Sequence, residues 1–459
     1  MDLLPTDNKQ VVELMMAKAK KAQKIIAEFN QQQIDAMVKA IGKTVYEHRE
    51  ILSREAVDET RLGLYENKVA KHISVPTGSW AYMRDKISVG VIDDDPVNHV
   101  ITLAKPMGVV VSVTPSTNPT TTATQNCMMA IKSGNAVIVC PHPRAKACTS
   151  HCVELINSAI QSCGGPADLV QTCAEPSIEL TGLMMAAADV VVATGGNGMV
   201  KAAYSCGKPS FGVGQGCVQA IIDPDYSDIS RVVRNVIANR TFDNGMPCTG
   251  EQALYIPSGR ESEILSAFQE AGAFIVTDEA ALRRIRETTF VNGQVNRDIV
   301  GKTAVEYAAM MDIDVPAGTK LIMLSLEKCG IDEPLAREIM LPMVRYYIYD
   351  DFKDAVAWAR ANYEQEGAGH SAVVYSENDE RILYAAQRLP VGRVLINQSG
   401  GGAAGNTSAN GLNPTMSVGC GSWGNNTISE NVTYRNLMNV TKIAYLIDAK
   451  PYDPEEIFA

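Results

Sequence analysis

The residues best suited to covalent chemistry stand in the run 241–252, where Cys248 follows a turn rich in glycine and proline. A helix is expected to end near Arg240, and the polar residues after it differ from the apolar surroundings of most other cysteines in the chain. A thiol acts as a nucleophile when it is exposed and its thiolate is stabilised. We therefore take Cys248 as a candidate nucleophile. A small residue packed in a loop is an equally good interpretation of the local sequence.

A second group suited to catalysis is Asn118, which lies between Pro115 and Pro119. The β-branched residues before it predict a strand, so the asparagine would project where that strand ends. An amide N–H is a suitable donor to an oxyanion that develops during a reaction. A turn asparagine held by local hydrogen bonds explains the same residue equally well.

Both residues need a framework, and the pattern after residue 108 supplies one. Short apolar β-branched runs alternate with helical stretches, which is typical of a parallel sheet with helices on both faces. Ligands bind to such sheets at the carboxyl ends of the strands. The expected strands are 108–114, 135–140, 168–172, 189–194 and 217–222, and the expected helices are 121–132, 145–162, 176–187 and 198–205.

A second α/β stretch is expected over 243–421, and a strand over 437–445 ends the pattern. Helices are expected near the start of the chain, and alternation around the turn 93–96 predicts a hairpin over 86–105. A two-stranded ribbon is marginal in water, so this hairpin should lie against another domain or another subunit. The expected strands of the second stretch are 253–256, 273–277, 320–324, 343–348, 371–375 and 393–396.

The composition argues against several classes of function. The 459 residues, 46% apolar and 20% charged, suit a globular chain of two or three domains. The 41 basic and 52 acidic residues give a net charge of −11, which disfavours nucleic acid and anionic membranes as partners. No apolar run is long enough to predict a membrane span, and residues 1–5 do not resemble a secretion signal. The 11 scattered cysteines are expected as free thiols in the cytoplasm.

Two further motifs are weighed and discounted. Cys140, His142, Cys148, His151 and Cys152 lie close in sequence, but their spacing matches no paired cysteine layout, so we expect no metal site. The run 400–405 matches G-x-G-x-x-G after an expected strand. Loop residues rather than a helix start follow it, so a second dinucleotide site is rejected.

Several motifs together resemble the aldehyde dehydrogenase superfamily. They are Asn118 between prolines, Cys248 after the Asp-Asn-Gly of 243–245, and the Glu-Ile-Met-Leu-Pro of 338–342. The runs 141–146, 193–196, 200–205, 212–214 and 419–424 are similar to its CoA-acylating branch, closest to the CoA-acylating succinate-semialdehyde dehydrogenases. The resemblance extends from about residue 10 to residue 445. It favours an enzyme over the alternative of a non-enzymatic, cysteine-rich metal-binding protein.

The resemblance implies an α/β fold of two doubly wound domains with a β-hairpin oligomerisation element. Residues 1–239 would form the NAD(P)-binding domain, with the hairpin 86–105 used for oligomerisation. Residues 240–422 would form the catalytic domain with the nucleophilic cysteine. Residues 423–459 would return to complete the interface of a homodimer or homotetramer.

The same resemblance implies roles for individual residues. Cys248 would be the nucleophile, and Asn118 with the backbone N–H of Cys248 would form the oxyanion hole. Glu338 would hold the nicotinamide ribose of NAD or NADP. His142 and Arg144 would lie near the adenosine ribose, where Arg144 could pair with a 2′-phosphate or equally be a solvated helix-start residue. The other residues expected around the cofactor are Pro115, Thr117, Thr194, Gly195, Gly196, Gly198 and Gly214, of which those at 194–198 would meet the pyrophosphate where a helix starts.

Gly214 also decides which acceptor takes the acyl group. Relatives that hydrolyse the thioester carry a glutamate base at this position, and a glycine cannot act as a base. Coenzyme A would therefore take the acyl group in a reversible exchange between thioesters. His370 could deprotonate or position the CoA thiol, although a histidine held by backbone hydrogen bonds after a glycine turn is an equal alternative.

The aldehyde is the least constrained part of the prediction. Succinate semialdehyde is favoured by the resemblance, with sulfoacetaldehyde or a small neutral aldehyde as alternatives. The chain departs from the family pattern at 246–248 and at 400–405, and both runs are expected to border the pocket. The expected pocket residues are polar and would suit an anionic tail; they are Thr249, Gln398, Ser399, Asn406 and Ser408.

Overall fold

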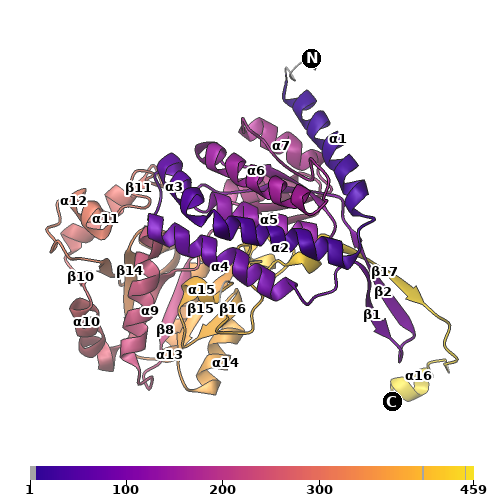
Figure 1. Ribbon diagram of the computed structural model, residues 1–459. Coiled ribbons are helices and arrows are strands. Elements are labelled where there is room, and N and C mark those ends of the chain that lie inside the picture. Colours follow the sequence, from indigo (N-terminus) through magenta and orange to yellow (C-terminus); the bar gives the residue numbers. More distant parts are fainter. Residues whose placement is uncertain (1–6, 406–407, 450) are drawn as a thin grey trace.

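The computed structural model describes residues 7–405, 408–449 and 451–459. Its framework consists of a five-stranded sheet, a seven-stranded sheet and a small three-stranded sheet that projects from the body (Figure 1). The two large sheets are parallel throughout, and a two-stranded ribbon completes the strand pairing.

The five-stranded sheet has the order β5-β4-β3-β6-β7. Its β-branched strands are buried because helices cover both faces, which explains their near-continuous apolar sequence. The chain moves outward from β3 through β4 to β5 and then returns to β6, so the order reverses between β3 and β6. A crevice at such a switch point is where ligands bind in open α/β sheets. The elements are β3 Val109–Val113, α5 Pro119–Lys132, β4 Ala136–Cys140, α6 Lys146–Ser162, β5 Val170–Thr172, α7 Ile178–Ala187, β6 Val190–Thr194, α8 Asn197–Ser205 and β7 Ser210–Val213.

Four N-terminal helices pack on this first unit (Figure 1). They are α1 Asn8–Ile26, α2 Gln31–Glu47, α3 Arg49–Thr60 and α4 Tyr65–Met83. Each buries one stripe of residues, and in α1 and α2 this stripe follows the 3–4 spacing of the sequence. In α4 the buried stripe also includes Lys68 and Lys71. A capping box at Asn30 fixes the start of α2.

The seven-stranded sheet has the order β10-β13-β14-β9-β8-β15-β16. Successive residues of its strands alternate between two apolar clusters, one on each face, because side chains of a strand point to opposite sides. Its strands are β8 Val218–Ile222, β9 Glu251–Pro257, β10 Ala273–Val276, β13 Leu321–Ser325, β14 Met343–Tyr349, β15 Gly369–Tyr375 and β16 Val391–Ile396. The helices of this unit are α9 Ile229–Thr241, α10 Glu261–Glu270, α11 Glu279–Thr289, α12 Ala304–Ala309, α13 Phe352–Gln365 and α14 Asp379–Arg388. Short elements are β11 Phe290–Val291, β12 Gln294–Val295, α15 Gly400–Ala403 and α16 Pro454–Ile457.

The small sheet joins the predicted hairpin to the end of the chain. Strands β1 Gly90–Asp95 and β2 Val100–Pro106 form the hairpin, and β17 Met438–Ala444 pairs antiparallel with β2. Figure 1 shows this sheet standing away from the rest of the molecule, with α16 and the C-terminus close to it. The side-chain amide of Asn135 donates to the carbonyl of Leu437 (2.9 Å) and fixes the returning tail to the first unit.

Most expected elements are confirmed to within a few residues, and several differ. The strand expected at 217–222 exists as β8, but its placement in the first sheet is wrong, because β8 pairs with β9 and β15. The change of sheet therefore falls between β7 and β8. Strand β7 was not expected. The hairpin turn lies at 96–99 instead of 93–96, because residues 93–95 pair with β2.

Candidate active site

The turn before Cys248 has an unusual backbone. Asp243, Asn244 and Gly245 have φ values of 53°, 53° and 73°, so three consecutive residues are left-handed. Asparagine and aspartate tolerate this region better than other side chains, and glycine tolerates it freely. A Cβ at Gly245 would stand 2.2 Å from the carbonyl oxygen of Leu341. The turn thereby directs the chain from α9 to Cys248, which lies just before β9 and is partly exposed.

A buried arginine locks this turn to the segment that follows Glu338. The Arg240 guanidinium donates to the carbonyls of Ile339 (2.9 Å), Met343 (3.1 Å), Gly245 (3.3 Å) and Leu341. Burial, and next the charge of Arg345, lower the pKa of Arg240 to about 10, so it stays charged at neutral pH. Sequence inspection treated Arg240 only as a helix end.

Three segments of the site meet at Gly216. A Cβ there would stand 2.1 Å from the carbonyl oxygen of Cys248 and 3.2 Å from Cδ2 of His370. The N–H of Gly216 donates to Oε1 of Glu338 (3.1 Å). The structure thus brings together Cys248, Glu338 and His370, as expected, through a glycine whose role the sequence did not reveal.

The Cys248 thiol is protonated in the resting site at neutral pH. Burial is the main cause that raises its pKa to about 12, and the charges of Glu338 and Cys420 add to the effect. The positive charge of Lys71 opposes them. The reaction therefore needs a stabilising partner for the thiolate or for the anion that it forms.

Glu338 is itself a weak acid in this environment. It is 5% exposed, and burial followed by the charge of Glu366 raises its pKa to about 8. The N–H of Glu338 donates to Oε2 of Glu366 (2.6 Å). At neutral pH the Glu338 carboxyl group is protonated in most molecules, which limits its repulsion of an anion on Cys248.

Asn118 is held in an orientation that a capping role does not explain. It is the N-cap residue of α5, yet its side chain makes no capping hydrogen bond in the described structure. Its Oδ1 accepts instead from Nζ of Lys71 (2.6 Å). Lys71 also donates to Oδ2 of Asp243 (2.5 Å), as does Lys68 (2.7 Å). Sequence reasoning missed this role for all three charged residues, although Lys68 and Lys71 occupy the buried stripe of α4.

The expected pyrophosphate cradle is open. Thr194 ends β6 and Gly196 is the N-cap of α8. Within the described residues, Cβ atoms at Gly196 and Gly198 would meet no heavy atom within 4 Å. The hydroxyl of Thr194 is buried without a hydrogen-bond partner among the described residues. Gly195 donates to the carbonyl of Val213 (3.3 Å) and closes the strand end. Free N–H groups at a helix start, beside an unpartnered hydroxyl, fit a phosphate group.

A cavity of about 500 Å³ borders this cradle. It begins at Asn197, the first residue of α8, and continues to Phe290, Ile331 and Arg337 of the second unit. The Arg337 guanidinium lies over the Phe290 ring, 5.3 Å from its centroid. The cavity therefore combines apolar walls with a cation and a helix start, which suits a nucleotide ligand.

On the other side of the switch point, Pro115 and Thr117 are partly buried, and the Thr117 carbonyl accepts from Nζ of Lys68 (2.6 Å). His142 and Arg144 are exposed at the start of α6. The N–H of Arg144 donates to Nδ1 of His142 (3.1 Å), and its guanidinium is 3.5 Å from the carbonyl of Thr60.

Gly214 carries no base, and a Cβ there would have only Asn197 Oδ1 nearby, at 3.7 Å. His370 is fully buried, and its Nδ1 lies 3.1 Å from the hydroxyl of Ser371. Its Nε2 has no hydrogen-bond partner within the described part of the chain. Burial, followed by the charge of Arg393, lowers the pKa of His370 to about 3, so the ring is neutral at neutral pH and is a weak base in this environment.

The expected aldehyde pocket is only partly assembled by the described residues. Thr249 donates to the carbonyl of Gly401 (2.8 Å), and the Ser399 hydroxyl accepts from the N–H of Gly401 (3.2 Å). Both hydroxyls thus shape the loop beside Cys248. Gln398 accepts from Asn410 (3.0 Å). Ser408 is exposed, and Asn406 lies outside the described residues.

That loop contains the short helix α15, which the sequence had suggested as loop only. A Cβ at Gly400 would stand 2.3 Å from the carbonyl oxygen of Thr249, so a glycine is needed where the loop passes the nucleophile segment. The N–H of Gly400 donates to Oε1 of the buried Glu251 (2.7 Å). The glycine run therefore packs against the β9 entrance rather than opening a dinucleotide-binding helix.

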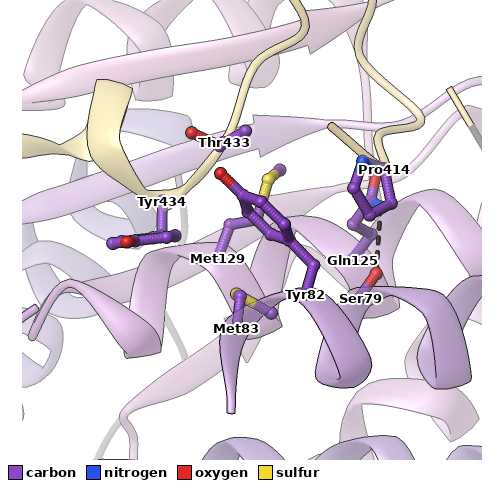
Figure 2. A pocket seen from close by; sticks show the side chains of 8 residues that line it. All are labelled: Ser79, Tyr82, Met83, Gln125, Met129, Pro414, Thr433 and Tyr434. Carbon is purple, nitrogen blue, oxygen red and sulfur yellow. Dashed lines mark hydrogen bonds between the residues drawn. The ribbon is translucent and has the colours of Figure 1, made fainter. Parts of the chain in front are cut away.

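A second, smaller pocket lies between α4, α5 and the chain near residues 414 and 433 (Figure 2). Tyr82 occupies its centre, and Gln125 donates to the hydroxyl of Ser79 (3.0 Å). Gln125 and Met129 line it about two and three turns along α5 from Asn118. None of the five expected pocket residues lines it.

The discounted cysteine and histidine cluster is spread over separate contacts. The Cys140 sulfur faces that of Cys173 (3.6 Å), Cys152 faces Thr124, and His151 contacts Glu55. No group of three or more possible metal ligands occurs among the residues described. Searched over the same residues, the helices include none that is long and apolar enough to span a membrane.

Comparison with known proteins places this geometry in context. The model of the aldehyde dehydrogenase family matches residues 3–300. A succinate-semialdehyde dehydrogenase (acetylating) of Clostridium kluyveri is 43% identical over 98% of this chain and 99% of its own. A sulfoacetaldehyde dehydrogenase of Acholeplasma is 34% identical over 96% of this chain and 92% of its own.

Solved structures agree in fold. An acetylating aldehyde dehydrogenase of Geobacillus thermoglucosidasius has a TM-score of 0.92 and 32% identity, covering 97% of this chain and 98% of that one. A propionaldehyde dehydrogenase of Rhodopseudomonas palustris, solved with bound CoA and an acylated cysteine, has a TM-score of 0.84 and 25% identity. It covers 95% of this chain and 97% of its own.

Proposed function

This chain belongs to the aldehyde dehydrogenase family, in its acylating branch, and we propose that it interconverts succinate semialdehyde and succinyl-CoA through a thioester on Cys248. The observation that carries the site assignment is the meeting at Gly216 of the Cys248 backbone, the Glu338 carboxyl group and the His370 ring. The full-length similarity to the Clostridium kluyveri enzyme supports the choice of aldehyde.

In the oxidative direction, Sγ of Cys248 forms a bond to the aldehyde carbon and loses its proton. The amide of Asn118 and the N–H of Cys248 donate to the resulting oxyanion. A nicotinamide cofactor, when bound, supplies the hydride acceptor in this direction and the hydride donor in reverse. Loss of hydride from the carbon leaves the acyl group as a thioester on Cys248.

The thiol of CoA then attacks the acyl carbon, and the bond to Cys248 breaks. We propose that His370 deprotonates or positions the CoA thiol, because its Nε2 lies unpartnered among the described residues. Gly214 supports thiol rather than water as acceptor, since no base stands at that position. One thioester replaces another, so the step is close to balanced and runs both ways.

The test is the dependence on CoA. Purified protein with succinate semialdehyde and NAD or NADP is expected to reduce no more cofactor than one equivalent per site until CoA is added. Succinyl-CoA should then form stoichiometrically with the reduced cofactor. Rapid steady formation of succinate without CoA, or full activity of Cys248→Ala, would contradict the proposal.

A second candidate substrate is sulfoacetaldehyde, favoured by the similarity to the Acholeplasma enzyme. Both aldehydes carry an anionic tail, so the shared chemistry is an anion near the polar loop of Thr249 and Ser399. The kcat/KM values for succinyl-CoA, sulfoacetyl-CoA and propionyl-CoA decide between them. A preference for propionyl-CoA would contradict both anionic candidates.

For the cofactor, we propose that Thr194, Gly195, Gly196 and Gly198 hold the pyrophosphate and that Glu338 holds the nicotinamide ribose. The open cradle at α8 supports this assignment. A comparison of the KM values for NADPH and NADH shows which of the two cofactors the protein prefers. A loss of NADPH preference in Arg144→Ala would assign the 2′-phosphate to that residue.

We also propose that the sheet of β1, β2 and β17 forms the interface of a homodimer or homotetramer. Exposed apolar side chains on it, such as Val440 and Ile443, support this use. Light scattering on the full chain and on a Val440→Glu/Ile443→Glu variant tests it. Unchanged mass in the variant would contradict the proposal.

A further inference from the structure

A compact group of charges lies directly behind Asn118. It consists of Lys68 and Lys71 from α4 and Asp243 from the left-handed turn. All three are buried, with 3%, 8% and 0% of their surfaces exposed. We call these three residues the α4 charge cluster.

The hydrogen bonds of the cluster connect both halves of the oxyanion hole. Lys71 donates to Oδ1 of Asn118 (2.6 Å) and to Oδ2 of Asp243 (2.5 Å). Asp243 belongs to the turn that directs the chain to Cys248, five residues later. Lys71 is therefore a direct link between the side chain of Asn118 and the nucleophile segment.

The geometry of the amide gives this link a chemical consequence. An ammonium group on Oδ1 fixes which end of the Asn118 amide is the carbonyl, so Nδ2 must face away from Lys71. The contact with Lys71 occupies Oδ1 alone, so the hydrogens of Nδ2 are directed to the other side, where a ligand can accept from them. Polarisation of the amide by a charged donor also strengthens its N–H groups as donors.

The net charge of the α4 charge cluster also favours an anion beside Asn118. Two ammonium groups face one carboxylate, so the cluster carries one more positive charge than negative charge in a buried place. The charged form of Lys68 is already disfavoured, because burial and then the charge of Lys71 lower its pKa to about 8. A buried charge without a partner is costly, and an anion nearby would complete the set.

The other partners of the cluster hold it in position rather than neutralise it. Oδ1 of Asp243 accepts from the N–H of Leu64 (2.8 Å), and Nζ of Lys68 donates to the Thr117 carbonyl (2.6 Å). A Cβ at Gly63 would stand 1.9 Å from Oδ1 of Asp243, so only glycine allows this approach. Each of these contacts keeps the group rigid and leaves its excess positive charge in place.

We propose that Lys71 is a positioning residue of the oxyanion hole, which orients the Asn118 amide and supplies the positive charge that the reaction's anion completes. This inference rests on the proposed function, since it assigns the anion to the adduct on Cys248. It adds a residue to the site and a reason for the pairing of two lysines with one aspartate.

The test compares Lys71→Met with two controls of similar size. Lys68→Met changes the charge of the cluster equally but leaves the contact to Asn118. Lys132→Met removes a different buried lysine, which pairs with Asp35. Lys132 lies at the far end of α5, about 20 Å from Asn118. Thermal unfolding shows which variants remain folded.

Loss of an oxyanion-hole donor lowers kcat by about 10²–10³-fold, which sets the expectation for Asn118→Ala. For Lys71→Met we expect a fall in kcat of about 10- to 100-fold, since the donor remains but is no longer oriented. KM for succinyl-CoA should change by less than about threefold, because ground-state binding is not altered. Lys132→Met should keep the kcat of the unmodified protein.

The double variant Lys71→Met/Asn118→Ala separates positioning from a general effect. If Lys71 acts through Asn118, the double variant is no slower than Asn118→Ala alone. Losses that multiply would overturn the inference, and so would an equal fall in kcat for Lys68→Met and Lys71→Met. A folded Lys71→Met with unchanged kcat would overturn it too, while an active Cys248→Ala would instead overturn the proposed function.

Discussion

Gly216 offers the sharpest test of the site geometry, because a single methyl group there would collide with backbone. In Gly216→Ala the new Cβ would lie 2.1 Å from the carbonyl oxygen of Cys248. Ordinary contact needs at least about 1 Å more, so the segment 214–217 or the nucleophile segment must shift by that amount. The backbone of Gly216 is not left-handed, so the collision is the only source of strain.

The expected loss follows from that displacement. A shift of about 1 Å in reacting groups costs on the order of 10²-fold in rate, whereas overpacking costs about 1–3 kcal/mol in stability. The same Cβ would also press on Cδ2 of His370 at 3.2 Å. We therefore expect kcat to fall by about 100-fold while the protein stays folded.

The assay is the reduction of succinyl-CoA by NADPH or NADH, with thermal unfolding measured in parallel. Gly182→Ala is the matched control, because Gly182 lies inside α7 and a Cβ there meets no heavy atom within 4 Å. That variant should keep its kcat and gain about 0.5–1 kcal/mol of stability. Equal kcat values for Gly216→Ala and Gly182→Ala would refute the placement of Cys248 against Gly216.

Three other predictions concern the groups around this point. Arg240→Met should lower the free energy of unfolding by about 3 kcal/mol in urea titration, because several buried carbonyls lose their donor; an unchanged urea midpoint would contradict this. Glu338→Gln should speed alkylation of Cys248 by iodoacetamide above pH 8 by up to about tenfold, which is the effect of one pKa unit. The reason is that the substitution removes a negative charge that raises the pKa of the thiol. A slower reaction would contradict this. The lowered pKa of His370 means that its contribution to stability is present above pH 6.5 and is lost as the pH falls toward about 3. His370→Asn should therefore show a weaker decline of melting temperature between pH 6.5 and 4, and an equal decline would contradict the buried, neutral state.

Much of the site could be predicted because its key residues stand in short motifs. Glycines and a proline lie close to Cys248, prolines lie close to Asn118, and runs of valine and isoleucine mark the strands. The sheet to which β8 belongs could not be predicted, because a buried parallel strand has the same apolar pattern in either sheet. Its partners, β9 and β15, come later in the chain, and only the packing of the whole molecule selects them.

The α4 charge cluster was missed for a related reason. Asp243 was considered only as part of a motif, and the lysines of α4 were not considered as site residues. The signal was present, since Lys68 and Lys71 fall on the same stripe as Val75 and Met83, where the helix is buried. A lysine on such a stripe needs a buried partner, but the sequence does not say that the partner lies 172 residues away.

The pairing of β2 with β17 has a consequence for how the polypeptide is made. Pro106 pairs with Met438, so this ladder joins residues more than 300 positions apart. During synthesis β2 emerges long before its neighbour exists, and its edge stays open until the last part of the chain leaves the ribosome. An unpaired strand edge invites association with other nascent chains. Chaperone binding to the newly made hairpin would protect it during that interval.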